Sequence, residues 1–415
     1  MPDFDLNATA AKVAAAARVL RSVEDAGRQA ALLAMADALE ASSSEVLAAN
    51  AADLASQEAA ALSPAARDRL VLDEGRLAAM VEGLRSVAQL PDPLGTLVSE
   101  DVRPNGLSVK RVRVPLGVIG VIYENRPNVT SDVAGLCVRA GSAAFLRGSA
   151  SALRSNLAIV AALRAGARAA GLPEDVVALV EDPDHAVAVA FMQLRGTIDC
   201  LIPRGGPGLL ASMREHATVP YVIDGDGNCH TYVDASANLA WALDIAVNAK
   251  AQRPGVCNAM ETLLVHEAVA AEFLPKLDSA LPQVELRGDA ATRAILARAK
   301  AATEEDYEDE FLDLILAVKV VGGVEEAIAH ISRYSSGHSE AIVADDEAVA
   351  ARFRSAVDAA AVVVNASTRF VDGGELGLGA EVGISTQKLH WRGPMGLEAL
   401  TATSWFIDGK GQVRG

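Results

Sequence analysis

The chain has 415 residues, with 37 Lys and Arg against 54 Asp and Glu, so its formal net charge is −17. This negative charge repels a polyphosphate backbone, and with no basic run to offset it we expect no nucleic-acid binding. The stretches between charged residues reach only about ten residues, short of the roughly twenty that cross a bilayer, so we expect no membrane span.

Two further features bear on the compartment. Asp3 and Asp5 stand near the start, where a secretory signal would have a basic segment ahead of an apolar core. The chain has four cysteines and no CxxC spacing, which argues against a disulfide framework and favours a reducing environment. The sequence therefore predicts a cytoplasmic protein.

Residues 10–90 are rich in Ala and carry apolar residues at helical spacing, for example Leu32, Met35 and Leu39, which predicts a helical layer. Residues 95–113 contain Asn105-Gly106 between two polar–apolar stretches. Because Asn-Gly favours the positive φ angles of a tight turn, we expect a β-hairpin there.

Two alternating series of apolar runs and helical stretches follow the hairpin. Runs that are apolar on both faces and are linked by helices are typical of parallel sheets covered on both sides. The tail at 401–413 alternates again, which predicts a strand at a sheet edge. The first series has expected strands at 117–123, 143–146, 176–180, 198–203 and 221–223, with helices at 151–170 and 185–194; the second has expected strands at 262–265, 312–321, 341–343 and 361–364.

The predicted class is thus α/β, with two doubly wound domains, a helical N-terminal layer and a β-arm for oligomerisation. We expect a first α/β domain at 1–250 that contains the hairpin, and a second at 251–390. A C-terminal segment at 391–415 would supply the oligomerisation strand. The two β segments together predict pairing between subunits, that is, a homo-oligomer.

Several common catalytic patterns are missing from the sequence. It has no GxxxxGK[ST] phosphate loop, no GxSxG elbow and no HExxH, and no close pair of Cys or His ligands suggests a zinc site. A Gly-rich stretch begins at Gly377 and Gly379, but Val382 and its context do not fit the usual dinucleotide fingerprint. We therefore expect no metal.

Cys257 stands out among the cysteines. It follows Pro254-Gly255 and precedes an apolar run, with Lys250 and Arg253 within seven residues. Nearby positive charge lowers a thiol pKa and raises the fraction of nucleophilic thiolate. The alternative is a buried structural thiol, which is the commoner role of a free cysteine. Cys137, Cys200 and Cys229 fit that alternative better.

The segment around Cys257 closely resembles the active-site region of the gamma-glutamyl phosphate reductases, a family of the aldehyde dehydrogenase superfamily. The resemblance extends in order over most of the chain. It is carried by RVPLG at 113–117, YENRPNVT at 123–130, IPRGG at 202–206, GNCH at 227–230, SGHSEAI at 336–342, GLGAEVGISTQKLH at 377–390 and RGPMGLE at 392–398.

The resemblance implies an aldehyde-dehydrogenase-like fold and an NADPH-dependent reduction of L-glutamate 5-phosphate to L-glutamate 5-semialdehyde, the second step of proline biosynthesis. Cys257 would carry the acyl group as a thioester. The Cys257 backbone N–H and the Asn128 side chain would stabilise the oxyanion; a turn role is the alternative for Asn128. Residues 224–228 lack the Glu that activates water in hydrolytic relatives, which fits a reductive enzyme.

The cofactor is expected to bind at three places. Arg147, with Gly148 and Ser149, matches the superfamily's adenosine-end site, and Arg147 would bind a 2′-phosphate. Residues Arg204, Gly205 and Gly206 close a strand and open a helix, where N–H groups bind pyrophosphate. Glu310 resembles the ligand of the nicotinamide ribose. The alternatives are a solvated charge at Arg147 and a wet acidic surface around Glu310.

The substrate carries anionic groups that need cations. The basic residues in the matching segments are Arg126, Lys250, Arg253 and Arg369, and His338 and Ser339 are expected to line the same cavity. No spacing separates these residues from ordinary salt-bridge partners.

Two other hypotheses remain. One is a related acylating enzyme that uses another acyl phosphate or a coenzyme A thioester. The other is a catalytically silent partner of a glutamate kinase. Such a kinase is also the protein partner that an active enzyme would be expected to have.

Overall fold

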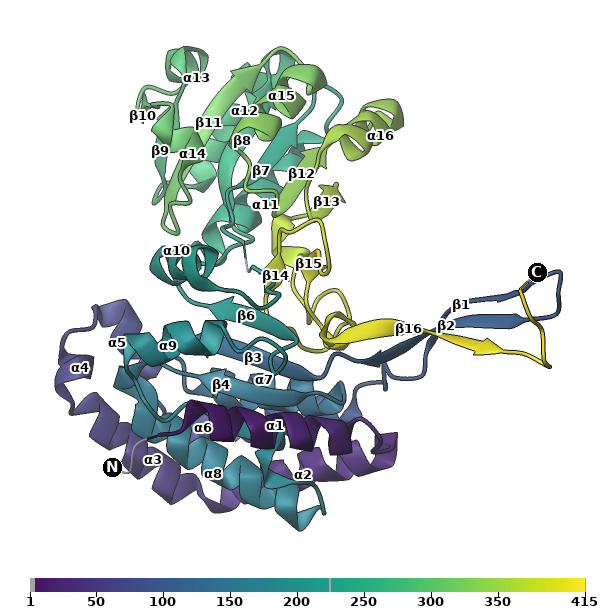
Figure 1. The fold of residues 1–415 in the computed structure, drawn as a ribbon. Coiled ribbons are helices and arrows are strands. Elements are labelled where there is room, and N and C mark those ends of the chain that lie inside the picture. The colour runs from purple at the N-terminus through teal and green to yellow at the C-terminus, as the bar shows by residue number, and fades with distance from the viewer. Residues whose placement is uncertain (1–3, 224, 415) are drawn as a thin grey trace. The chain divides into compact units, whose positions relative to one another are not determined.

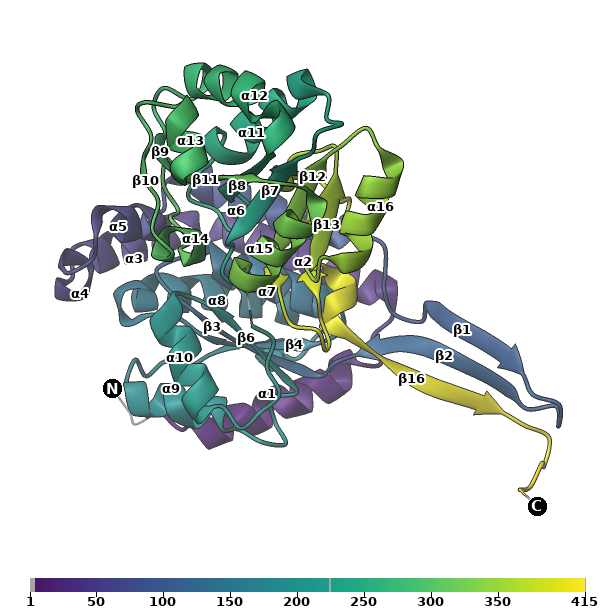
Figure 2. The ribbon, with the colours of Figure 1, turned by 90° about the horizontal axis from the view of Figure 1, so that it is seen from above.

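The structure is a computed structural model that describes residues 4–223 and 225–414 (Figures 1 and 2). Contacts divide the chain into two compact units. Unit 1 comprises Met1–Ile223, Leu378–Gly383 and Met395–Gly415, and unit 2 comprises Asp224–Gly377 and Ile384–Pro394. Among the described helices, none has both the length and the apolar character of a membrane-spanning segment.

The division between the units differs from the boundary expected at residue 250. Strand β7 (Cys229–Val233) pairs with β8 (Met260–His266), so the residues from 225 onward belong with the second sheet. Similarly, β14 (Ile384–Ser385) pairs with β15 (Gly393–Pro394), which keeps 391–394 in unit 2. Strand pairing, invisible in composition, fixes both boundaries.

Unit 1 begins with the predicted helical layer. Side chains cap the amino ends of several of these helices. At the first helix, for example, the Asp5 carboxylate accepts the Ala8 N–H at 2.9 Å. The layer consists of α1 (Leu6–Leu20), α2 (Asp25–Ala41), α3 (Ser43–Leu54), α4 (Gln57–Ala60), α5 (Pro64–Leu70) and α6 (Glu74–Gln89).

A four-stranded parallel sheet follows, in the order β5-β4-β3-β6. All residues of β3 are buried, as the continuous apolar run predicts. The expected strand at 221–223 is wrong: Tyr221 makes only an isolated bridge to Leu201, and a single bridge does not form a strand. The elements are β3 (Val118–Tyr123), α7 (Asn128–Arg139), β4 (Ala143–Arg147), η1 (Ala150–Ala152), α8 (Leu153–Ala169), η2 (Glu174–Val176), β5 (Val177–Leu179), α9 (His185–Met192), β6 (Cys200–Arg204) and α10 (Pro207–His216).

The predicted hairpin and tail strand form a β-arm of unit 1 (Figures 1 and 2). Strands β1 (Leu97–Val102) and β2 (Ser108–Pro115) are antiparallel, and Gly106 in their turn has a φ of +86°. Strand β16 (Thr401–Asp408), which follows η4 (Leu397–Leu400), pairs along the whole of β2. Both predicted β segments are confirmed, and the role of the arm in oligomerisation stays a prediction.

Unit 2 contains a seven-stranded sheet in the order β10-β9-β11-β8-β7-β12-β13, in which every pairing is parallel. Neighbouring residues of β8 serve opposite faces: Leu263 packs with the core of α11 and α12, and Leu264 with that of α15 and α16. The remaining elements are α11 (Leu239–Ala251), α12 (Glu267–Ala280), β9 (Glu285–Gly288), α13 (Ala290–Ile295), β10 (Lys300–Ala301), α14 (Glu305–Glu308), β11 (Ile315–Val321), α15 (Val324–Tyr334), β12 (Ser339–Val343), α16 (Glu347–Ala356), β13 (Ala361–Val364) and η3 (Thr368–Phe370).

A glycine lets α8 pack closely on α2. A Cβ atom on Gly166 would lie 2.5 Å from the Met35 Cα atom and 2.6 Å from the Ala34 carbonyl oxygen. Because backbone cannot move aside as a side chain can, we expect Gly166→Ala to lower the free energy of unfolding by about 1–3 kcal/mol. Urea denaturation measures it.

Gly83→Ala in α6 is the matched control, since its nearest neighbour would be an Asp132 oxygen at an ordinary 3.8 Å. It should raise the free energy of unfolding by up to about 1 kcal/mol through helix propensity. Equal effects of the two substitutions would contradict the close packing of α2 and α8.

Candidate active site

The nucleophile loop, residues 252–259, lies at the amino edge of the unit 2 sheet. Cys257 precedes β8, and the loops that precede β7, β11 and β12 contain Gly227, Glu310 and His338. Because these strands are parallel neighbours, their amino ends meet at one edge. The topology thus brings together candidates that are up to 111 residues apart.

Cys257 is the only half-exposed cysteine of the four, all of which lie in the described part of the chain. Burial raises the pKa of Cys200 to about 12 and also raises the pKa values of Cys137 and Cys229 well above their ordinary value. These three thiols therefore stay protonated at neutral pH. The accessible position of Cys257 supports the nucleophile hypothesis over the structural one.

The backbone of Cys257 is packed against the start of β7. A Cβ atom on Gly227 would lie 1.7 Å from the Cys257 carbonyl oxygen, so only glycine fits there. The Cys229 thiol donates a hydrogen bond to the same oxygen at 3.2 Å. GNCH at 227–230 thus supports the nucleophile loop.

Asn258, which follows the nucleophile, binds the segment around η3. Its side-chain amide donates to the Val371 carbonyl at 3.0 Å, and its own carbonyl accepts the Thr368 hydroxyl at 2.7 Å. The Arg369 guanidinium donates to the Asn258 side-chain oxygen. These bonds place Arg369 beside the nucleophile loop, where the sequence predicted a substrate ligand.

Lys250 forms a fully buried ion pair with Glu261, with 2.5 Å between Nζ and Oε2. The other Glu261 oxygen accepts the Leu312 N–H at 3.2 Å. Burial lowers the pKa of Lys250 and raises the pKa of Glu261 to about 7. Because its ammonium is bound to Glu261, Lys250 is not available to a substrate anion, and its role as a substrate ligand is not retained.

Glu310 lies at the same edge and is half-buried. Its carboxylate accepts the Gly227 N–H at 2.8 Å. It therefore differs from its exposed neighbours Glu308 and Asp309, which fit the wet-surface alternative. Glu310 thus contacts Gly227, which in turn packs against Cys257. Its role as a ribose ligand stays a prediction.

His338 and Ser339 are both fully buried and so do not line an open cavity. The imidazole Nδ1 lies 2.8 Å from the Ser339 hydroxyl and 3.8 Å from the Cys229 sulfur. Burial lowers the pKa of His338 to about 4, so the ring is neutral at pH 7. The expectation that they contact substrate is not met here; instead they pack behind the nucleophile loop.

Unit 1 holds the other candidates. Asn128 is exposed at the first position of α7 and donates to an Asp132 oxygen at 3.0 Å. Burial raises the pKa of Asp132 to about 6. Asn128 belongs to unit 1 and Cys257 to unit 2, so its oxyanion role stays a prediction, as does substrate binding by the half-buried Arg126.

The cofactor candidates of unit 1 meet at the carboxyl edge of its sheet, where α/β sheets usually bind ligands. Arg147 ends β4; it donates to the Pro183 carbonyl at 2.8 Å, and its Nε atom is buried without a hydrogen-bond partner in the described chain. A Cβ on Gly148 would lie 2.1 Å from the Asn156 amide nitrogen, so a side chain there would displace that of Asn156. The hydroxyl of Ser149 donates to the Asn125 side chain at 3.0 Å.

Arg204 ends β6, and Gly205 and Gly206 lead into α10. A Cβ on Gly206 would meet nothing within 4 Å, so there is space at this helix start. The Gly206 N–H donates to the Glu124 carboxylate at 3.2 Å. The orphaned Arg147 nitrogen and the open helix start fit a phosphate-bearing cofactor, for which the Glu124 carboxylate would have to yield the Gly206 N–H.

No group of three or more His, Cys, Asp or Glu residues in the described chain is arranged to hold a metal. Sequence reasoning missed Glu261 and Asn258. A charged residue inside the apolar strand 260–265 was the available signal for Glu261, because a buried carboxylate needs a partner. Asn258 had no signal beyond its place next to Cys257.

Comparison with known proteins gives a consistent result. Residues 3–307 match the model of the aldehyde dehydrogenase family. A gamma-glutamyl phosphate reductase of Moorella thermoacetica is 54% identical over 96% of both chains, and one of Carboxydothermus hydrogenoformans is 52% identical over 98% of both. The crystal structure of the Thermotoga maritima gamma-glutamyl phosphate reductase matches with a TM-score of 0.97 at 44% identity, covering 99% of this chain and 100% of that one.

The Lys250–Glu261 pair can be tested by removing one partner. Lys250→Met leaves the Glu261 carboxyl buried and unpaired, so we expect the free energy of unfolding to fall by about 3–5 kcal/mol. In the double variant Lys250→Met/Glu261→Gln, the amide still accepts the Leu312 N–H, and most of the loss should be recovered. Urea denaturation at pH 7 measures both; additive losses would contradict the coupling.

Buried histidines make stability depend on pH. Burial lowers the pKa of His338 to about 4 and that of His330 to about 3, whereas an unfolded histidine titrates near 6.5. As the pH is lowered from 6.5 to 4, only the unfolded chain gains these protons, so the free energy of unfolding decreases. The slope of this decrease approaches about 1.4 kcal/mol per pH unit for each histidine.

His330→Phe keeps a ring against Tyr307 and Tyr334, which His330 contacts with ring centroids 5.0 and 4.5 Å away. Urea denaturation at pH 7, 6 and 5 should show a shallower loss of stability in this variant than in the wild type. Identical slopes would mean that His330 does not titrate as its burial requires.

Proposed function

This chain belongs to the gamma-glutamyl phosphate reductases of the aldehyde dehydrogenase family, and we infer that it reduces L-glutamate 5-phosphate to L-glutamate 5-semialdehyde with release of phosphate, a step of proline biosynthesis. The observation that carries this inference is the half-exposed Cys257 in a loop held from both sides. It is an oxidoreductase that acts on a small molecule with a nicotinamide cofactor.

Cys257 acts as the nucleophile. Its thiolate attacks the acyl carbon, the C–O bond to phosphate breaks, and a thioester forms. After reduction, the thiohemiacetal collapses by breaking the C–S bond, which releases the aldehyde and restores the thiolate. The phosphate leaves as an anion, so no acid has to protonate it.

Positive charge near the loop stabilises the thiolate. Burial lowers the pKa of Arg369, and the negative charges of Asp372 and Cys257 oppose this change. Arg369 is thus within electrostatic reach of the sulfur, and Arg253 acts on Arg369 in turn. The attraction between guanidinium and thiolate favours the ionised nucleophile at neutral pH.

Each tetrahedral intermediate carries an oxyanion that needs hydrogen-bond donors. We assign the Cys257 backbone N–H and the Asn128 side chain to this role, each contributing roughly 3 kcal/mol in a site that excludes water. The stretch at 225–228 contains no Glu to activate water, which protects the thioester from hydrolysis.

NADPH is the proposed cofactor. When bound, it supplies the hydride that reduces the thioester. Arg147, with Gly148 and Ser149, would hold the adenosine end, and the orphaned Arg147 nitrogen supports recognition of a 2′-phosphate. Residues Arg204, Gly205 and Gly206 would bind pyrophosphate, and Glu310 the nicotinamide ribose.

The assembly and setting of the enzyme are also proposals. The arm has two strand edges, β1 and β16, and the exposed side chains Trp405, Phe406 and Ile407 of β16 favour pairing with another copy of the chain. A glutamate kinase partner would pass on the labile acyl phosphate. Both would operate in the cytoplasm.

The test is phosphate-dependent reduction of NADP⁺ by L-glutamate 5-semialdehyde. The wild type should be active, and Cys257→Ala should lower kcat by roughly a thousandfold or more, because the covalent route is lost. Cys137→Ala, a thiol buried in unit 1, is the control and should retain activity.

Turnover only with an acyl-coenzyme A would contradict the substrate assignment. Full activity of Cys257→Ala would contradict the mechanism. Comparing NADP⁺ with NAD⁺ for the wild type and for Arg147→Gln then tests the cofactor assignment; an unchanged ratio of kcat/KM values would remove Arg147 from it.

A further inference from the structure

Unit 2 has a small polar pocket beside the nucleophile loop, between the last turn of α11 and the segment after η3. Its volume is about 210 Å³, below the roughly 300–1,000 Å³ of pockets for drug-sized ligands. The pocket is therefore suited to a molecule of amino-acid size. Its walls are Asn248, Gln252, Arg369, Phe370, Asp372 and Glu375.

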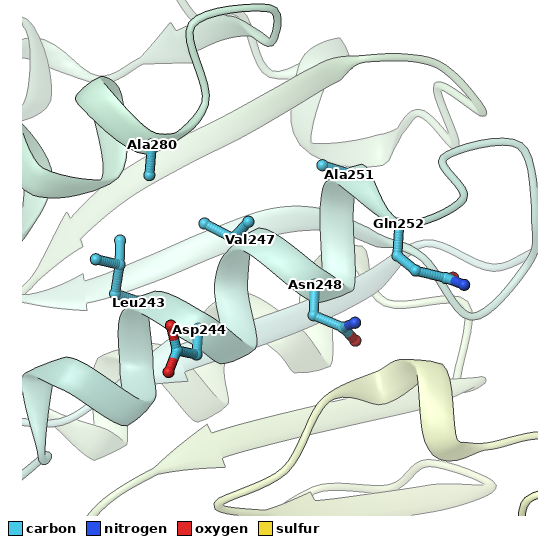
Figure 3. A pocket seen from close by; sticks show the side chains of 7 residues that line it. All are labelled: Leu243, Asp244, Val247, Asn248, Ala251, Gln252 and Ala280. Atoms are coloured by element: carbon cyan, nitrogen blue, oxygen red, sulfur yellow. The ribbon is translucent and has the colours of Figure 1, made fainter.

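Helix α11 presents two different sides. Figure 3 shows a second pocket along α11, which shares Asn248 and Gln252 with the polar one; there Leu243 and Val247 lie on the side towards Ala280, whereas Asn248 and Gln252 point the other way. Gln252 accepts a hydrogen bond from Arg369 Nε at 2.9 Å. The polar side of α11 thus helps to fix the cation of the pocket.

The Arg369 guanidinium is held by hydrogen bonds to uncharged groups. Its Nε and one terminal nitrogen donate to the side-chain amides of Gln252 and Asn258, which carry no charge. Within residues 4–223 and 225–414, no carboxylate forms an ion pair with it at 4 Å or less, and its second terminal nitrogen makes no hydrogen bond. A half-buried guanidinium in this state is prepared for an anion.

Asp372 supplies the opposite charge in the same pocket. Its Oδ1 accepts the N–H groups of Gly374 and Glu375 at 2.9 and 3.4 Å, which fixes the carboxylate. Its Oδ2 has no hydrogen-bond partner among the described residues. Asp372 is half-buried and Glu375 is exposed, so Asp372 is the better-oriented acceptor for a cation.

The pocket also adjoins the reacting atom. Arg369 binds Asn258, the residue next to Cys257, and its charge interacts with the Cys257 sulfur. The pocket therefore lies beside the nucleophile loop. All these residues belong to unit 2.

We propose that this pocket binds the α-amino-acid end of the substrate, with Arg369 binding the α-carboxylate and Asp372 the α-ammonium. This assignment rests on the proposed function, and it identifies the residues that would select an α-amino acid as substrate. A cation and an anion that do not pair with each other match the two charges of a zwitterion, and the two methylenes of the substrate then carry its acyl group to Cys257. Asp372 is thereby a specificity-determining residue.

The experiment compares three aldehydes in the reverse assay with phosphate and NADP⁺: L-glutamate 5-semialdehyde, 5-oxopentanoate, which lacks the amino group, and 4-aminobutanal, which lacks the carboxylate. The wild type should prefer the first by at least about tenfold in kcat/KM over each analogue, because each leaves one charge unpaired. Asp372→Asn should bring the ratio of the first to the second close to one.

Arg369→Gln should bring the ratio of the first aldehyde to the third close to one. Asp345→Asn, an exposed carboxylate of unit 2 outside the pocket, is the matched control and should keep both ratios. The ratios separate recognition from folding, because a merely destabilised variant loses activity on all three aldehydes alike.

Each remaining outcome overturns a defined statement. If the folded wild type turns over none of the aldehydes, the proposed function fails. If the wild type is active but Asp372→Asn and Arg369→Gln lower all three activities in proportion, the pocket assignment fails while the function stands. If Glu375→Gln rather than Asp372→Asn removes discrimination by the amino group, the ammonium ligand is misassigned.

Discussion

Parallel pairing of β7, β8, β11 and β12 is the constraint on which the nucleophile site depends. Parallel strands place all their amino ends at one edge, so four loops that are distant in sequence meet around Cys257. The packing there is tight, since any side chain at position 227 would collide with the Cys257 carbonyl. The pairing of the strands thus determines where the Cys257 sulfur lies.

The loop is further fixed by polar groups buried beneath it. The Lys250–Glu261 pair links α11, β8 and the segment that carries Glu310, and Asn258 links the nucleophile to η3. Removing two charges from water costs free energy that an apolar core would not require. These buried polar groups serve the geometry of the loop rather than maximal stability, because hydrogen bonds fix directions that apolar packing leaves open.

The two sheets use opposite edges. In unit 1 the candidate phosphate ligands Arg147 and Arg204 end their strands, at the carboxyl edge where α/β sheets usually bind ligands. In unit 2, Cys257, Glu310 and His338 precede their strands. The same α/β construction therefore serves two tasks: helix starts and strand ends for a phosphate-bearing cofactor, and tight loops before the strands for a nucleophile.

The sequence by itself determined the helical layer, the hairpin with its partner strand and most strands of both sheets, because periodicity and turn chemistry are local. Neighbouring charge and the family resemblance singled out Cys257 as the candidate nucleophile. Only the tertiary structure decided that residues 225–250 belong to unit 2, that 221–223 is not a strand, and that Lys250, His338 and Ser339 are buried. It alone also placed Arg369 and Asp372 in one pocket with Gln252. Burial and pairing depend on what the rest of the chain places around a residue, which no local pattern records.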